Sequence, residues 1–145
     1  MGVGGMGSFH ARTLARFAGV DVVSIADPHQ PNAVAAADET GARVVADPYE
    51  LIADPGINAV VIASPDDTHA DLAVAATDRG LFTLCEKPLA TTVADAKRVV
   101  DAELRAGRRL VQMGFMREFD PAHVQLVGEL ASLSLIHISE PTRPY

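Results

Sequence analysis

Short apolar segments alternate with helical segments along this chain, and the alternation restricts the possible folds more than any other feature. The segment 59–63, Ala-Val-Val-Ile-Ala, has no polar alternation, which is typical of a parallel strand covered on both faces. Strands and helices in such an order form an α/β fold with a parallel sheet and right-handed crossovers. The predicted strands are 22–26, 42–46, 59–63, 81–85 and 110–113, and the predicted helices are 8–17, 31–40, 49–53, 68–79 and 92–106.

The segment 92–106 gives the strongest helix prediction. Thr92, with Asp95 three residues later, forms a plausible capping pair at its start, and Gly107 ends it. Four apolar residues of this helix share one face: Val93, Ala96, Val100 and Leu104.

Composition limits the class of protein. A chain of 145 residues with 48% apolar and 21% charged residues is long enough for one globular domain and too short for two. The net charge of -7 argues against a nucleic-acid partner. We find no apolar run long enough to span a membrane and no signal peptide. The lone cysteine, Cys85, permits no internal disulfide, and a cytoplasmic location is the default expectation. No metal-binding residues are predicted.

The loop at the start of the chain has glycines at the spacing G-x-G-x-x-G. In a dinucleotide-binding loop the first glycine makes a tight turn, the second lets the backbone approach a pyrophosphate, and the third lets the helix pack close to its strand. The following helix offers free N–H groups to the phosphates. The pattern is weak alone, but here it opens a predicted helix. We therefore predict a Rossmann-type, doubly wound sheet with a cofactor-binding loop of Gly2, Gly4, Gly5, Met6 and Gly7.

An acidic residue ends the next predicted strand. Asp27 lies twenty residues after Gly7, where a carboxylate would accept hydrogen bonds from the adenosine ribose. The alternative is a turn loop followed by a solvated aspartate. A 2′-phosphate would meet a like charge at Asp27, the next basic residue is Arg43, and His29 is the only possible helper. The predicted cofactor is therefore NAD, with NADP less favoured.

Three polar loops follow later strands at their carboxyl ends, where ligands of open α/β sheets bind. We expect all three to converge on the crevice that starts at the glycine loop. Their sequences are Ser64-Pro65-Asp66-Asp67-Thr68-His69, Glu86-Lys87-Pro88, and Gly114-Phe115-Met116-Arg117-Glu118-Phe119-Asp120-Pro121.

These motifs resemble the family of glucose–fructose oxidoreductase, inositol dehydrogenase and MocA-like oxidoreductases over residues 1 to about 130. Segments 85–92 and 109–117 are most similar to the inositol 2-dehydrogenase branch. Two departures are Glu118, where a second basic residue is usual, and the pair Asp66-Asp67. The resemblance rests on the glycine loop followed by His10, the Pro65…His69 pair, Glu86-Lys87-Pro88-Leu89-Ala90, and the Gly-Phe-Met-Arg…Phe-Asp-Pro run.

The resemblance implies a site around a catalytic lysine. Lys87 would lie beside the substrate and the nicotinamide, and would take or relay the hydroxyl proton as hydride leaves a secondary alcohol. A surface lysine at a strand end is the alternative. Pro88 resembles the family's cis proline. The further residues predicted to contact the cofactor are Ser64, Pro65, His69, Glu86, Lys87 and Arg117.

Three of these cofactor contacts have structural alternatives. His69 is as often a helix cap or packing group as a ribose contact. Glu86 could have a purely structural role at its strand end, and Arg117 could simply neutralise nearby acids.

The resemblance also implies the function of the whole protein. It would transfer hydride from a polyol or sugar secondary alcohol to NAD, with myo-inositol at C2 the best-matched substrate, and would form a homo-oligomer. The alternatives are another sugar substrate within the family, or a dinucleotide-binding module without catalysis. The run Glu86-Lys87-Pro88 favours the enzyme, because a binding module needs no lysine at the nicotinamide end.

Both ends of the chain are predicted to be truncated. The domain is assigned to residues 1–130, with its first strand missing and its C-terminal substrate domain absent, so that 22–26 and 59–63 would flank a gap. Residues 131–145 are predicted to be a tail and not a domain, because Leu133–Arg143 resembles one reading frame of a transposase adapter used in short-read libraries. Alternatively, 134–138 could form a native strand.

Overall fold

A computed structural model describes residues 1–132, which divide into two units that are described separately. The first unit, Met1–Gly114, contains alternating strands and helices. Its elements are α1 (Gly5–Leu14), β1 (Ser24–Ala26), α2 (Gln30–Thr40), β2 (Arg43–Val45), α3 (Pro48–Ala53), β3 (Ala59–Ile62), η1 (Asp66–Thr68), α4 (His69–Asp78), β4 (Phe82–Cys85), α5 (Val93–Ala106) and β5 (Val111–Met113).

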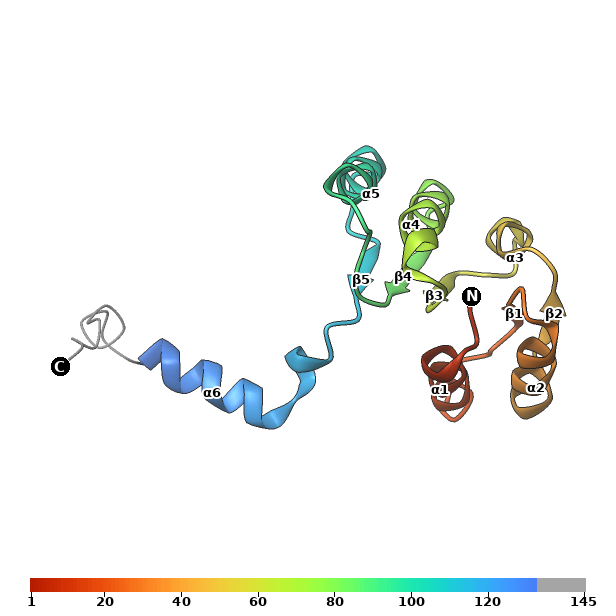
Figure 1. Cartoon of the computed structure of the whole chain (residues 1–145), viewed down its shortest axis with the longest axis horizontal. Helices are drawn as coiled ribbons and strands as arrows, with labels where there is room; N and C mark the ends of the chain where they lie inside the picture. The colour runs from red at the N-terminus through yellow and green to blue at the C-terminus, as the bar shows by residue number, and fades with distance from the viewer. Residues whose placement is uncertain (133–145) are drawn as a thin grey trace. The chain divides into compact units, whose positions relative to one another are not determined.

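The strands of the first unit pair in parallel, as predicted, but in two groups. One group has the order β2-β1 and the other has the order β3-β4-β5. Helices α1 and α2 lie on one side of the strands, and α3, α4 and α5 lie on the other (Figure 1). This arrangement confirms the doubly wound α/β fold. It corresponds to the order 3-2-1-4-5-6, with β1 and β3 on either side of the place of the central strand.

Residues 1 and 2 occupy the place between β1 and β3. The N–H of Gly2 donates to the Ala26 carbonyl (2.8 Å), and the N–H of Ala63 donates to the Met1 carbonyl (2.9 Å). The Met1 amino group donates to the Val61 carbonyl (2.7 Å). No strand precedes α1 in the described chain, as predicted, but the expected gap is partly closed by these main-chain bonds.

Two hydrophobic clusters fill the first unit, and the larger one extends across both groups of strands, since it contains Ala26 of β1 and Val45 of β2 as well as Ile62 of β3. The larger lies around β3, β4 and α4 and includes Ile62, Cys85 and Val99, which are almost completely buried. The smaller joins Val3 and Ile25 to three alanines of α2. Because these alanines have small side chains, α2 packs closely against β1. The larger cluster therefore joins the two halves of the unit, and the smaller one includes Val3 from the glycine loop.

Helix α1 begins three residues before the predicted start, at Gly5, because the glycine loop turns directly into the helix. The predicted cap of α5 is confirmed: Thr92 Oγ1 accepts from the Asp95 N–H (3.1 Å) and donates to the Asp95 carboxylate (2.7 Å). That hydrogen bond, with a second from Arg98, holds the pKa of Asp95 below its usual value.

The apolar face predicted for α5 is its exposed side. Val93 is 87% exposed and Leu104 is 73% exposed, whereas Val99 and Ala102 are buried. The helix carries two apolar stripes, and the one with the smaller residues packs, because α4 approaches closely on that side. The sequence could not show which stripe faces the sheet.

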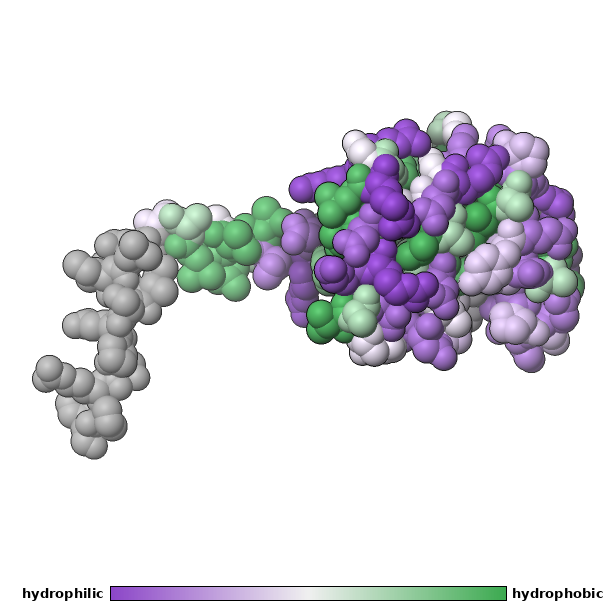
Figure 2. Space-filling model, turned by 90° about the horizontal axis from the view of Figure 1, so that it is seen from above, coloured by the Kyte–Doolittle hydropathy of each residue, from purple (hydrophilic) through white to green (hydrophobic). Residues whose placement is uncertain are grey.

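The second unit is described from Phe115 to Ser132. It consists of η2 (Met116–Phe119) and α6 (Pro121–Ser132). Apolar side chains gather along α6 (green in Figure 2) and are about half exposed: Val124, Leu126, Val127 and Leu130. Residues 133–145, which hold most of the predicted tail and the possible strand 134–138, lie outside the described residues. Residues 1–132 contain no helix that combines the length and apolar character needed to cross a membrane.

We expect the stability of this chain to depend on pH through its amino terminus. Burial of the Met1 amino group lowers its pKa from 8.0 to about 6, against the opposing effect of the Asp27 charge. Because the folded-state pKa is the lower one, the unfolded chain binds more protons between pH 6 and 8. The free energy of unfolding should therefore rise across this window, by roughly 3 kcal/mol for two pKa units, and level off above it. Urea denaturation at a series of pH values measures this rise.

An N-terminal extension of about five to seven apolar residues, the usual length of a buried strand, supplies the control. It replaces the charged amine with a peptide N–H and provides partners for β1 and β3. The extended chain should be more stable at every pH, and the extra slope between pH 6 and 8 should disappear. A slope of the same size in both chains would show that other groups cause it.

Candidate functional site

The glycine loop has two glycines that no other residue can replace without a clash. Gly2 has φ +74°, and a Cβ there would lie 2.5 Å from the backbone of Ser64. A Cβ on Gly7 would overlap the Gly2 carbonyl oxygen, so the absence of a side chain at Gly7 lets α1 pack against the loop. By contrast, a Cβ on Gly4 or Gly5 would meet nothing within 4 Å. The loop is therefore tight on its inner side and open on its outer side.

The open side of the loop exposes the N-terminus of α1. Gly4 caps this helix without a side-chain hydrogen bond, so the first N–H groups of the helix lack the capping partner that Ser, Thr or Asp would supply. The Ser8 hydroxyl closes the loop from within by donating to the Val3 carbonyl (2.7 Å). The free N–H groups lie at the positive end of the helix dipole, and the glycines beside them have no side chain that would block a ligand. This arrangement suits the pyrophosphate of a dinucleotide.

Asp27 lies at the end of β1 and is held by the main chain. Its Oδ2 accepts from the Val3 N–H (2.6 Å), and its Oδ1 accepts from the His29 N–H (2.7 Å). The residue is only 8% exposed. Each carboxylate oxygen has a second lone pair, so it can also accept from a ribose hydroxyl. A fixed negative charge here would repel a 2′-phosphate, which agrees with the prediction of NAD.

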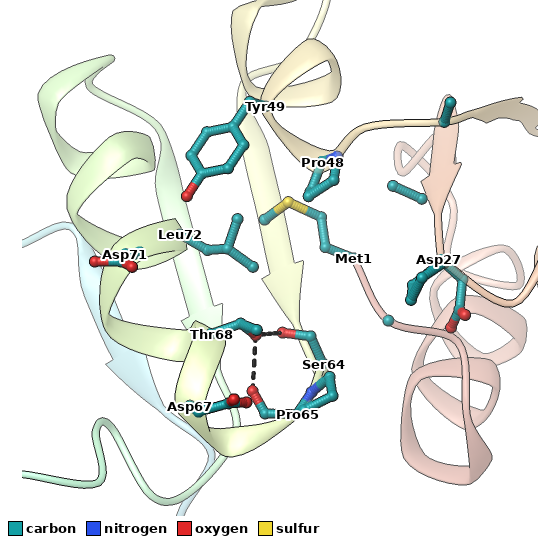
Figure 3. Close-up of a pocket in the computed structure, with 14 residues that line it drawn as sticks. Met1, Asp27, Pro48, Tyr49, Ser64, Pro65, Asp67, Thr68, Asp71 and Leu72 are labelled. Atoms are coloured by element: carbon teal, nitrogen blue, oxygen red, sulfur yellow. Dashed lines mark hydrogen bonds between the residues drawn. The ribbon is translucent and has the colours of Figure 1, made fainter.

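A cleft of about 350 Å³ opens beside the glycine loop. Figure 3 shows Asp27 on one side of it and the Ser64–Pro65 turn on the other, with Met1 between them. Gly2 also lines the cleft, so four of the predicted cofactor residues share it. The cleft also has wall residues that were not predicted to contact the cofactor: Pro28, Ala46, Pro48, Tyr49, Asp67, Thr68, Asp71 and Leu72.

The turn after β3 is ordered by its own hydroxyl groups. Thr68 Oγ1 donates to the Pro65 carbonyl (2.7 Å) and lies 2.6 Å from Ser64 Oγ, as the dashed lines in Figure 3 show. The Thr68 N–H also donates to the Pro65 carbonyl (2.9 Å). Pro65 is therefore held rigidly at the edge of the cleft.

His69 follows this turn and is buried at the start of α4. Its Nδ1 lies 2.7 Å from the Pro88 carbonyl oxygen, and its Nε2 lies 2.8 Å from the Ser64 carbonyl oxygen. The ring is 1% exposed, which leaves little surface for direct contact with a cofactor. The ribose contact assigned to His69 remains a prediction, and its observed contacts are with the main chain.

Glu86 joins three of the predicted motifs. Its carboxylate lies 2.8 Å from His10 Nε2 on α1, and a Cβ on Gly114 would meet that carboxylate at 3.0–3.2 Å. The Gly114 N–H also donates to the Cys85 carbonyl (2.7 Å). Together with the His69 bridge, these contacts confirm that the loops after β3, β4 and β5 converge beside the glycine-loop helix.

Lys87 is exposed at the end of β4, and its peptide bond to Pro88 is cis. Within residues 1–132, the Lys87 amine forms no ion pair. Arg117 belongs to the second unit, where it pairs with Asp120 (3.0 Å), and its cofactor contact remains a prediction. Burial raises the pKa of the neighbouring Cys85 thiol to about 12, which makes it an inert packing group.

The comparisons with known proteins agree with this geometry. Residues 1–115 match the model of an oxidoreductase family, described as its NAD-binding Rossmann fold, the family of glucose–fructose oxidoreductase, inositol dehydrogenase and MocA. The chain belongs to this family. It is an NAD-binding Rossmann domain with parallel strands between helices, as predicted.

The relatives that it matches include inositol dehydrogenases. The chain is 48% identical to inositol 2-dehydrogenase 1 of Saccharopolyspora erythraea, over 94% of this chain and 43% of the relative. It is 45% identical to inositol 2-dehydrogenase of Rubrobacter xylanophilus, over 91% of this chain and 38% of the relative. A crystal structure of myo-inositol dehydrogenase from Lactobacillus casei, in complex with NAD(H) and myo-inositol, is 36% identical, with a TM-score of 0.85 over 90% of this chain and 40% of that one. The chain thus spans about 40% of the length of these relatives.

We expect Gly7→Ala to destabilise the domain, because the new methyl group would overlap the Gly2 carbonyl and push α1 away from the loop. Overpacking of this kind costs roughly 1–3 kcal/mol. Thermal and urea denaturation of the variant measure the loss.

Gly5→Ala is the matched control, since a Cβ there meets nothing within 4 Å and alanine favours the first turn of α1. Its stability should equal or exceed that of the parent chain. Equal stabilities for the Gly7→Ala and Gly5→Ala variants would mean that the loop is not tight.

Proposed function

We propose that the whole protein containing this domain is an NAD-dependent dehydrogenase of a polyol, with a secondary hydroxyl of an inositol as its substrate and Lys87 as the residue that handles the proton. The observation that carries the proposal is the placement of an exposed, unpaired lysine at the carboxyl end of β4, where the loops of the dinucleotide site converge. The identity with inositol 2-dehydrogenases over nearly the whole chain supports the substrate class.

The domain holds NAD mainly through its backbone. The glycine loop and the first turn of α1 would hold the pyrophosphate, and Asp27 would accept hydrogen bonds from the adenosine ribose. Ser64 and Pro65 close the opposite side of the cleft. When bound there, NAD would supply the acceptor for the hydride that leaves the alcohol carbon.

Lys87 acts on the proton of the alcohol. The amine takes or relays the hydroxyl proton while the carbon–hydrogen bond breaks, so that a ketone and not a protonated carbonyl is formed. The neighbouring Glu86 contacts His10 through Oε1 (2.8 Å). Lys87 is exposed, so the substrate side of the site is open in this domain. We also propose that the whole protein forms a homo-oligomer and is located in the cytoplasm.

The test is the NAD-dependent activity of the full-length protein on a panel of cyclitols and sugars, followed by that of its Lys87→Ala variant. We expect activity on myo-inositol or a related polyol. The substitution should lower kcat by about 10²–10⁴-fold, the usual contribution of a positioned acid or base, and leave the Kd for NAD nearly unchanged.

Lys97→Ala is the control, because Lys97 is also exposed but pairs with Asp101 on the outside of α5. It should leave kcat unchanged. Tight NAD binding without activity on any polyol would favour a binding module over the enzyme. An unaltered kcat in the Lys87→Ala variant would remove that residue from the mechanism.

A further inference from the structure

The buried ring of His69 lies between two turns of the site and contacts the main chain of both. We propose that His69 is a positioning residue, which fixes the Lys87–Pro88 turn through its Nδ1 contact with the Pro88 carbonyl. The proposal deepens the proposed function and rests on it, because it concerns the aim of Lys87. The two contacts, at 2.7 and 2.8 Å, have the distances of good hydrogen bonds.

The chemistry of the two contacts determines what the ring must do. A carbonyl oxygen can only accept, so the histidine must donate. A ring protonated at one nitrogen donates to one carbonyl, and a ring protonated at both donates to both. We assign a proton to Nδ1, and therefore a hydrogen bond to the Pro88 carbonyl. At 1% exposure, no water competes for this bond.

The backbone itself provides no comparable link between the two turns. The last bond between the neighbouring strands joins the Glu86 N–H to the Ile62 carbonyl (2.9 Å). Beyond it, within the described residues, no backbone–backbone hydrogen bond joins 63–69 to 87–92. Without His69, no hydrogen bond within the described residues would join the segment after Glu86 to the Ser64 turn.

Lys87 therefore lies between two residues that are each held by a histidine from a helix. Glu86 precedes it and contacts His10 of α1, and Pro88 follows it and contacts His69 of α4. Only the second contact reaches the main chain on the far side of Lys87. Loss of that contact should let the backbone of the lysine move, which affects proton transfer more than cofactor binding.

Two substitutions separate the two contacts of the ring. His69→Asn keeps an N–H close to the place of Nδ1, facing Pro88, and His69→Gln keeps one close to the place of Nε2, facing Ser64. In the full-length enzyme with NAD and myo-inositol, His69→Gln should lower kcat on the order of 10- to 100-fold, as expected for a misplaced catalytic group. His69→Asn should restore most of kcat. The Kd for NAD should change less than kcat in both variants.

Thr77→Val is the matched control. Thr77 is buried on the same helix, and its hydroxyl has no hydrogen-bond partner in the described residues, so its loss should leave kcat and the Kd for NAD unchanged. Equal kcat values for the Asn and Gln variants would overturn the proposal. So would a lower kcat for Asn than for Gln.

A measurement on the unsubstituted protein keeps the test valid if the variants fold poorly. In NMR spectra of the protein labelled with ¹⁵N-histidine, we expect a proton on Nδ1 of His69 that exchanges slowly with solvent. Its signal is assigned by its absence from the spectrum of either variant that folds, or by contacts with Pro88. A bare Nδ1 would overturn the proposal. If the unsubstituted enzyme oxidises no polyol but this proton is present, the proposed function fails while the contact between His69 and Pro88 stands.

Discussion

The main-chain bonds of residues 1–3 join the two halves of this domain. Gly2 bonds to the end of β1, Met1 bonds to β3 and Ala63, and Val3 bonds to the Asp27 carboxylate. Met1 belongs to the larger hydrophobic cluster and Val3 to the smaller one. The same residues form the glycine loop. Cohesion of the sheet and the shape of the cofactor site are therefore set by the same few bonds.

This shared dependence explains why the tight side of the loop tolerates no side chain. A Cβ on Gly2 would strike Ser64, which lies across the cleft from Asp27. Any side chain at position 2 would push the turn after β3 away from the end of β1. It would thus change the width of the cleft as well as the pairing of the strands. Because Gly2 has no side chain, the cleft stays narrow and the strands stay close enough to pair.

The sequence predicted the class of fold and the loops of the site, because each depends on local patterns. Apolar segments without polar alternation identify covered parallel strands, and parallel strands place their carboxyl ends at one edge. The positions of Asp27, Ser64 and Glu86 after strands were predicted in this way. The start of α1 was misplaced by three residues, because the glycines that look like a loop already belong to the helix.

The sequence could not predict contacts that depend on how distant segments pack. His10 and Glu86 are 76 residues apart, and nothing in either motif indicates that they meet. The apolar residues of α5 lie on more than one side of the helix, and the sequence did not indicate that Val99 and Ala102 would be the buried ones. For His69, the sequence left a cap, a packing group and a cofactor ligand open. The choice depends on two carbonyl groups whose positions follow from the paths of two separate turns.

The polar contacts of the site fall into two groups, according to the segment that each contact positions. Asp27 binds N–H groups of its own half, and the Thr68 hydroxyl orders the turn beside it. These contacts fix where a dinucleotide can lie, and all of them are local to the cleft. The two histidines instead reach from helices to the turn that carries Lys87. A substitution at a histidine can thus change the aim of the lysine while the cofactor walls stay in place. Under the proposed function, binding of the dinucleotide and positioning of Lys87 would therefore be separable properties of this domain.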